Sequence, residues 1–169
     1  MPDMTDNSDL IPPRPVPDGF VDFEVAEGFA KHIGPLYWKL SKDSAELGFH
    51  VLDHHLNPGK ICHGGVMMTV ADMAVGFAVV WNIKLLSFAP SINNNYDFIG
   101  AGLPGDWLET RTEVIQTTKR MGFARGVLTG SNGPVLRYNG ILKIPSKTDP
   151  RFNSKAFAAR MQKLFDQNT

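Results

Sequence analysis

The stretch that decides the fold is residues 65–81, which read Gly-Val-Met-Met-Thr-Val-Ala-Asp-Met-Ala-Val-Gly-Phe-Ala-Val-Val-Trp. Its only charged residue is Asp72, and no side of a helix built from it would be polar. Such a segment predicts a helix that other elements enclose on all sides. At 1.5 Å per residue it would be about 25 Å long, which is short for a membrane span.

Short strands are predicted before and after this helix, because runs rich in apolar residues end at Gly, Pro or Asn. These strands are residues 36–40, 45–52, 91–98, 107–117, 122–130 and 135–144. The first two strands predict a hairpin around residues 41–44, and the four consecutive strands from residue 91 onward predict an antiparallel meander.

Helices are predicted at both ends of the chain from the spacing of apolar residues. An imperfect stripe covers residues 20–31, and a regular i, i+4, i+7, i+8 pattern is formed by Phe157, Met161, Leu164 and Phe165. The predicted fold class is therefore α+β, with one long buried helix wrapped by an antiparallel sheet.

The chain has 169 residues, of which 43% are hydrophobic, enough for one domain with its own core. Residues 1–18 contain five prolines and four aspartates against one arginine, so we expect a mobile tail with a net charge of −3. The expected division is this tail, a main domain at 19–147 and an added helix at 148–169.

Charge, hydrophobic patterning and cysteine content exclude several classes of function. Lys plus Arg and Asp plus Glu number 17 each, which argues against a nucleic-acid partner. No apolar run of 18 residues and no secretory signal pattern is present, so neither a membrane partner nor export is expected. Together with the single cysteine, Cys62, this predicts a cytoplasmic protein without a disulfide framework.

Asp72 is the first candidate for chemistry. A carboxylate inside an apolar helix costs several kcal/mol when it is charged and unpaired, so folding alone would not select it. One explanation is structural, with Asp72 capping a loop or pairing with an arginine. The other is that Asp72 is a general base or a nucleophile in a cleft beside the helix.

His63, Gly64 and Gly65 precede the apolar stretch and lie at the predicted helix N-terminus. The glycines allow close approach of a ligand, and the first N–H groups of a helix have no intrahelical partner. They could form an oxyanion hole, or they could simply be a loop-to-helix turn. Because Asp72 lies two helical turns from Gly65, a shared site would take Gly64 from one subunit of a dimer and Asp72 from the other.

Asn57, His63-Gly64-Gly65 and Asp72, in this spacing, resemble the hotdog-fold acyl-coenzyme A thioesterases of the phenylacetate-catabolism (PaaI-like) type, over about residues 45–145. The resemblance implies an acyl-coenzyme A hydrolase that needs no cofactor, since coenzyme A is part of the substrate. It also implies that Asp72 is the catalytic carboxylate and that the Gly64 N–H polarises the thioester carbonyl.

Three further roles follow from the same resemblance. Asn57 would orient the carbonyl or the attacking water, His63 would support the loop near the acyl group, and Ser91 would hold the water. The run Asn93-Asn94-Asn95 is more polar than is usual for this family.

Substrate contacts and subunit partners are predicted less directly. Lys119, Arg120 and Arg125 could bind the phosphates of coenzyme A, although solvated turn charges are an equally good explanation. Adjacent His54 and His55 lack a third ligand at suitable spacing, so no metal is expected. The exposed edge and face of such a sheet predict a homodimer, with a homotetramer as a further step.

Two rival functions remain open. A hotdog enoyl-coenzyme A hydratase or dehydratase would add or remove water at a carbon–carbon double bond. A binding module would hold acyl-coenzyme A without turnover. The acyl group itself is not defined, since Phe77, Trp81 and Phe88 could line an aryl or medium-chain pocket or simply belong to the core.

Overall fold

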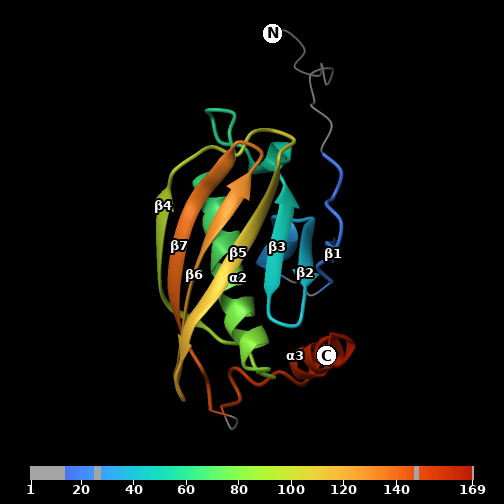
Figure 1. Cartoon of the computed structure of the whole chain (residues 1–169), viewed down its shortest axis with the longest axis vertical. Coiled ribbons are helices and arrows are strands. Elements are labelled where there is room, and N and C mark those ends of the chain that lie inside the picture. The colour runs from blue at the N-terminus through green and yellow to red at the C-terminus, as the bar shows by residue number, and fades with distance from the viewer. Residues whose placement is uncertain (1–13, 25–27, 147–148, 169) are drawn as a thin grey trace.

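One long helix lies along the inner face of a curved, seven-stranded antiparallel sheet (Figure 1). The computed structural model describes residues 14–24, 28–146 and 149–168. The strands are β1 (Val21–Asp22), β2 (Leu36–Leu40), β3 (Ala45–His50), β4 (Ser91–Phe98), β5 (Trp107–Thr117), β6 (Met121–Gly130) and β7 (Gly133–Lys143). The helices are α1 (Phe29–His32), the 3-10 turn η1 (Asp53–His55), α2 (Gly64–Asn82) and α3 (Lys155–Gln167). The predicted α+β architecture is confirmed.

The strand order is β1-β2-β3-β5-β6-β7-β4. The predicted meander is correct for β5, β6 and β7, which follow one another through short turns. It is wrong for β4, which does not pair with β5 but joins the far side of β7. The chain can make this crossing because α2 carries it along the sheet before β4 begins, and β4 is left as an eight-residue free edge.

The N-terminal segment differs from the predicted helix over residues 20–31. Val21 and Asp22 form a strand that pairs with β2, and among the described residues of this segment the helix is limited to Phe29–His32. Aromatic packing explains the extended conformation, because the Phe23 ring lies edge-on to Trp38 and Phe77. Residues 1–13 of the predicted tail lie outside the described residues, whereas the Arg14 N–H donates to the Gly105 carbonyl.

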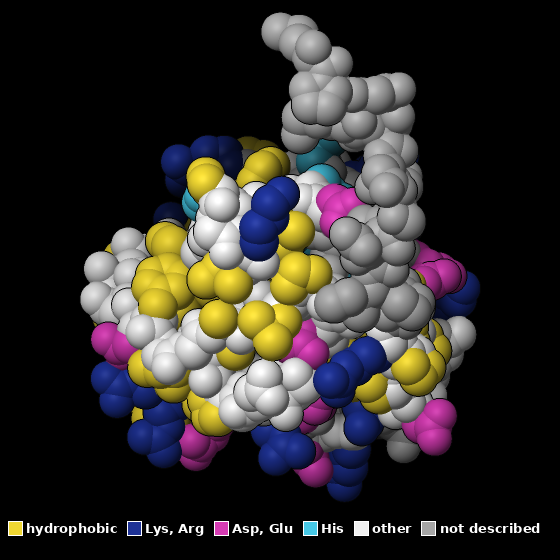
Figure 2. All heavy atoms as spheres, turned by 90° about the horizontal axis from the view of Figure 1, so that it is seen from above, with side chains coloured by type: hydrophobic (Ala, Val, Ile, Leu, Met, Phe, Trp, Pro, Cys, Tyr) yellow, Lys and Arg dark blue, Asp and Glu magenta, His cyan; other side chains and the backbone are white. Residues whose placement is uncertain are grey.

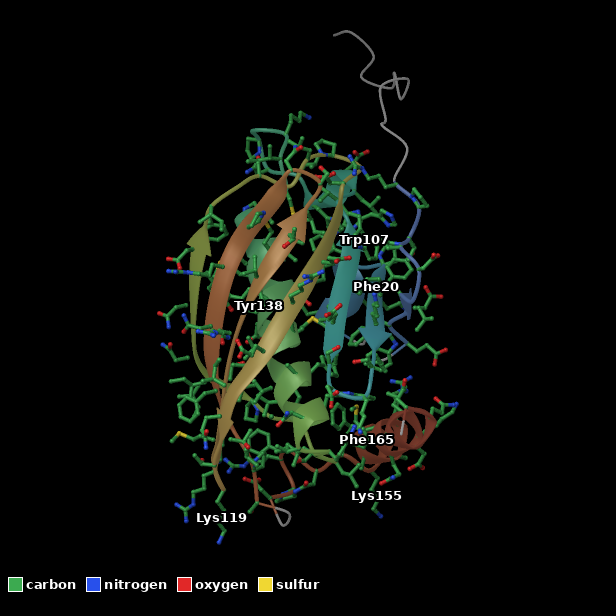
Figure 3. All side chains as sticks on the ribbon, viewed as in Figure 1. Phe20, Trp107, Lys119, Tyr138, Lys155 and Phe165 are labelled. Carbon is green, nitrogen blue, oxygen red and sulfur yellow. The ribbon has the colours of Figure 1, made fainter. Side chains whose placement is uncertain are left out.

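The two faces of the sheet differ in polarity. The outer face carries charged pairs between neighbouring strands, such as Arg125 on β6 with Glu113 on β5. The inner face packs on α2 through fully buried leucines and through Tyr138, which lies in the middle of the sheet (Figure 3). Two glycines, Gly122 and Gly140, let α2 approach closely, since a Cβ at either would lie under 3 Å from a valine of that helix.

Helix α2 is not enclosed on all sides, contrary to the prediction. An accessible stripe runs along it at helical spacing through Gly65, Met68, Asp72, Met73 and Gly76. The single sheet covers the opposite side, and a helix flanked by one sheet keeps its other side open. α2 is long and apolar enough to span a membrane by length and composition, but half of that window is buried within the protein, as expected for a core helix.

The predicted C-terminal helix is confirmed as α3, which lies beside the lower end of α2 and beneath β2 and β3 (Figures 1 and 3). The Ser154 hydroxyl accepts a hydrogen bond from the Phe157 N–H and caps its first turn. Met161 and Phe165 are buried, and the Phe165 ring lies 5.1 Å from that of Trp81. α3 therefore closes the lower end of the core.

Candidate active site

The first turn of α2 presents a backbone donor that makes no hydrogen bond to any described residue. His63 is the N-cap, and its Nδ1 accepts a hydrogen bond of 2.8 Å from the Gly65 N–H. The proton of a neutral His63 ring therefore sits on Nε2. The N–H of Gly64, in contrast, has no acceptor among the described residues. At the positive end of the helix dipole it can bind a developing oxyanion.

The ring of Phe98, at the end of β4, lies close to Gly64. A Cβ placed on Gly64 would lie 2.9 Å from Cε1 of the Phe98 ring, although that ring is 52% exposed to solvent. A glycine at position 64 thus leaves room for both the aromatic ring and an approaching ligand.

Asn57 shapes the loop that leads to the helix. Its Oδ1 accepts hydrogen bonds from the N–H groups of Gly59 (2.9 Å) and Ile61 (3.4 Å). Its Nδ2 makes no hydrogen bond with the described residues and is the group that could bind a carbonyl oxygen or a water. The role predicted for Asn57 stays a prediction.

Asp72 lies on the accessible stripe of α2 and is half-buried. Its Oδ1 accepts hydrogen bonds of 2.5 Å from Ser91 Oγ and from Asn94 Nδ2. Both donors hold the same oxygen, whereas Oδ2 accepts no hydrogen bond from the described residues. The carboxylate is therefore fixed by one oxygen while the other is available for chemistry.

The resemblance predicted that Ser91 belongs to the site, as the residue that holds the water, but Asn94 was not predicted. The signal was present as the unusually polar run Asn93-Asn94-Asn95. On a regular strand residues 91 and 94 would point to opposite faces, because side chains alternate. A β-bulge between Ser91 and Asn93 inserts one extra residue and turns both donors toward α2.

Tyr96 is a second residue that sequence reasoning missed. Burial and the nearby negative charge of Asp72 both raise the pKa of its phenol. Tyr96 therefore stays protonated at neutral pH and bounds the site next to Asn94 as a neutral group.

Gly64 and Asp72 do not meet within one chain. They are eight residues apart on one helix, a separation of about 12 Å along its axis. The structure thus places a helix N-terminal donor without an acceptor among the described residues and an oriented carboxylate at separate points on α2.

The basic residues predicted for coenzyme A do not form a single cluster. Lys119 and Arg120 lie in the β5–β6 turn, at the lower end of the sheet (Figure 3). Arg125 lies on the outer face, where its Nη2 is 3.0 Å from Glu113. Their phosphate-binding role stays a prediction.

Cys62 is buried, and burial raises the pKa of its thiol to about 12. It is a packing residue, since a nucleophilic cysteine needs a thiolate near neutral pH. Across the part of the chain that the structure describes, no three His, Cys, Asp or Glu side chains gather as metal ligands. His55 instead links its loop to the Ile33 carbonyl through Nε2, at 3.0 Å.

Comparison with known proteins agrees with this fold. The sequence model of the Thioesterase superfamily matches residues 59–135, which include Gly64, Asp72, Ser91 and Asn94. The curated protein "Putative esterase PA0474" of Pseudomonas aeruginosa is 27% identical over 131 residues, covering 77% of this chain and 98% of that protein.

Two solved structures show the same architecture. The PaaI protein of Escherichia coli, from the phenylacetic acid degradation operon, has a TM-score of 0.62 and 23% identity, covering 69% of this chain and 83% of that one. A hypothetical thioesterase protein of Streptococcus pneumoniae, determined with coenzyme A, has a TM-score of 0.60 and 17% identity, covering 68% and 91%.

Residues 59–135 thus match the sequence model of the Thioesterase superfamily, and the fold of the chain is the hotdog fold of these solved structures. Helix α3 lies beyond the matched segment.

Proposed function

We propose that this protein hydrolyses the thioester of an acyl-coenzyme A to a free acid and coenzyme A. The observation that carries the proposal is the contrast at the helix N-terminus: the Gly65 N–H is bound by His63, while the Gly64 N–H is free among the described residues. An aligned, unused donor at a helix N-terminus suits a thioester carbonyl whose oxygen becomes negative.

The site is completed by a second copy of the chain. Gly64 and Asp72 are two turns apart on one helix, so one carbonyl cannot easily be reached by both groups of the same subunit. In a homodimer, Gly64 of one subunit and Asp72 of the other can face a single substrate. A pair of such sites follows from two-fold symmetry.

Two surfaces support this dimer. β4 is a free edge of eight residues, which presents unpaired N–H and C=O groups. Near it and around the start of α2, large apolar side chains are exposed by between 38% and 58%: Met68, Ile92, Phe98, Ile99 and Leu103. Figure 2 shows hydrophobic side chains gathered on the end of the molecule where α2 begins. Pairing of two β4 edges would cover these groups.

The chemistry has two routes in this site. In the first route, Asp72 Oδ2 takes a proton from a water molecule, and the oxygen of that water attacks the carbonyl carbon. The C–S bond then breaks, and the thiolate leaves with a proton. In the second, Oδ2 attacks the carbonyl directly, the thiolate leaves, and water hydrolyses the mixed anhydride. Single turnover in ¹⁸O-labelled water distinguishes them, since label in the Asp72 carboxylate requires the anhydride.

The deciding experiment is release of free thiol from a panel of acyl-coenzyme A thioesters by wild type and Asp72→Asn. We expect turnover by wild type and a loss of about 10² to 10⁴ in kcat for the variant, as for removal of a general base. Binding without thiol release by wild type would overturn the proposal and leave a binding module. Loss of an enoyl absorbance without thiol would indicate a hydratase.

A further inference from the structure

Beside Asp72, an apolar pocket runs along α2 toward α3. Apart from Asp72 and Ser91 at its mouth, its lining is Met73, Gly76, Phe77, Val80, Phe88, Ala89 and Phe157. Its volume is about 70 Å³. A cavity of about 150 Å³ holds a benzene ring, so this pocket suits a smaller apolar group.

Gly76 has no packing reason to be a glycine. Gly122 and Gly140 face α2 so closely that a Cβ would collide with Val79 or Val75. A Cβ at Gly76 would have its nearest neighbour at 3.8 Å, the Cδ2 atom of Leu142, which is an ordinary contact. A glycine within a helix lowers stability relative to alanine, so its presence here calls for another explanation. The space left by the absent side chain of Gly76 is part of the pocket.

Another wall of the pocket is formed by Phe157, which lies outside residues 59–135, the segment that matches the superfamily model. Phe157 is half-buried in the first turn of α3, and this turn is fixed by the Ser154 cap. The rest of α3 is anchored by Met161 and Phe165, so the position of the Phe157 ring is set by the core. α3 thus places an aromatic ring at the pocket that starts at the oriented carboxylate.

We propose that this pocket binds the acyl group, that Gly76 and Phe157 set its size, and that it selects short, uncharged apolar acyl chains. The inference rests on the proposed function, because it takes Asp72 as the point where the thioester lies. The pocket lining carries no charged or polar side chain beyond its mouth, so a carboxylated or hydroxylated chain would lose its hydration without a partner.

The test uses S-alkyl-coenzyme A thioethers, which cannot be hydrolysed, with butyl and octyl chains. Calorimetry gives the dissociation constant of each for wild type, Phe157→Ala, Gly76→Ala and the control Leu164→Ala. Leu164 lies on the same helix but borders a different hollow, with Val21 and Trp38. The acyl thioesters of the same two lengths are then assayed for hydrolysis.

We expect wild type to prefer the butyl chain. Phe157→Ala should raise the octyl-to-butyl affinity ratio by about tenfold or more, as expected for methylene groups in an apolar pocket. Gly76→Ala should weaken binding of both alkyl chains, and Leu164→Ala should match wild type. Circular dichroism checks that α3 persists, and Gly76→Ala tests the pocket independently of α3.

The outcomes separate the two proposals. If thioesters are hydrolysed but neither variant changes chain-length preference, the pocket assignment is wrong and the proposed function stands. If the thioethers bind with the expected shifts but nothing is hydrolysed, the pocket stands and the proposed hydrolysis fails. If no thioether binds wild type, the pocket assignment is wrong, and the thioester assay alone then decides the proposed function.

Discussion

Ser91 and Asn94 lie three positions apart on β4 and yet donate hydrogen bonds to the same atom, Oδ1 of Asp72. The β-bulge at Ile92 makes this possible, because its extra residue brings both side chains to the inner face. The pairing leaves Oδ2 without a hydrogen bond from the described residues. Backbone irregularity on an edge strand therefore orients the candidate catalytic carboxylate.

The role of Asn94 can be tested by Asn94→Ala. Hydrogen bonds to a charged group contribute about 1.5–3 kcal/mol, so loss of this donor should lower kcat by about tenfold to a hundredfold. KM should change little if Asn94 acts through Asp72 rather than on the substrate. Asn95→Ala is the matched control, because Asn95 bonds to Asn93 and Asn139 instead. Equal effects of the two substitutions would argue against a positioning role.

The proposed sharing of the site between two subunits predicts complementation between inactive variants. Gly64→Ala puts a methyl group where the ligand approaches, and Asp72→Asn removes the carboxylate, so each protein alone should have little activity. After unfolding and refolding of an equal mixture, half of the dimers are mixed and hold one intact site. Thiol release should then recover to about a quarter of the wild-type value. No recovery, with mixed dimers shown by native mass spectrometry, would place both groups of each site in one subunit.

Two glycines should respond to alanine in opposite directions. At Gly140 a Cβ would lie 2.8 Å from Val75 Cγ1 and would also collide with Asn94 Oδ1, so Gly140→Ala should lower the free energy of unfolding by about 1–3 kcal/mol. Gly76→Ala should raise it by about 0.8–1 kcal/mol, because the helix gains propensity without a clash. Urea unfolding measures both. A destabilised Gly76→Ala protein would mean that position 76 is packed more tightly than the structure shows.

The lowered pKa of His55 predicts that the folded protein loses stability in mild acid. Burial, and then the neighbouring His54, lower the pKa of His55 below its usual value in the folded protein. The unfolded chain consequently binds this proton more readily, and stability falls as the pH drops through the ordinary histidine pKa of about 6.5. In the folded protein, Nδ1 also accepts a hydrogen bond from the Leu52 N–H, and a proton on Nδ1 would abolish that bond.

The measurement is urea unfolding at pH 7.5 and 5.5 for wild type and His55→Gln. Glutamine cannot be protonated, so the difference between the two pH values should shrink, even if the variant is less stable at both. A difference as large as that of wild type would assign the acid sensitivity to other groups.

Much of the fold can be predicted from sequence because it depends on local patterns. The apolar run around α2, the boundaries of β4 and β5, and the amphipathic spacing of α3 are all local, and all three predictions agree with the structure. The predicted helix at residues 20–31 failed because Phe23 packs with Trp38 and Phe77, which are distant in sequence. Its apolar spacing resembled a helix, but tertiary packing decided the conformation.

The candidate site likewise has some features that the sequence determines and others that only the tertiary structure determines. The spacing of His63, Gly64 and Asp72 on one helix is a property of the sequence, since 3.6 residues per turn determines how far apart they lie. The direction of Asp72 is decided by tertiary structure, because Asn94 reaches it only through a bulge and through the pairing of β4 with β7. The space beside Gly76 likewise exists only because α3 returns to the end of α2. Helical periodicity acts within one segment, whereas bulges, strand order and pockets depend on contacts between segments, and this is why they emerged only from the folded chain.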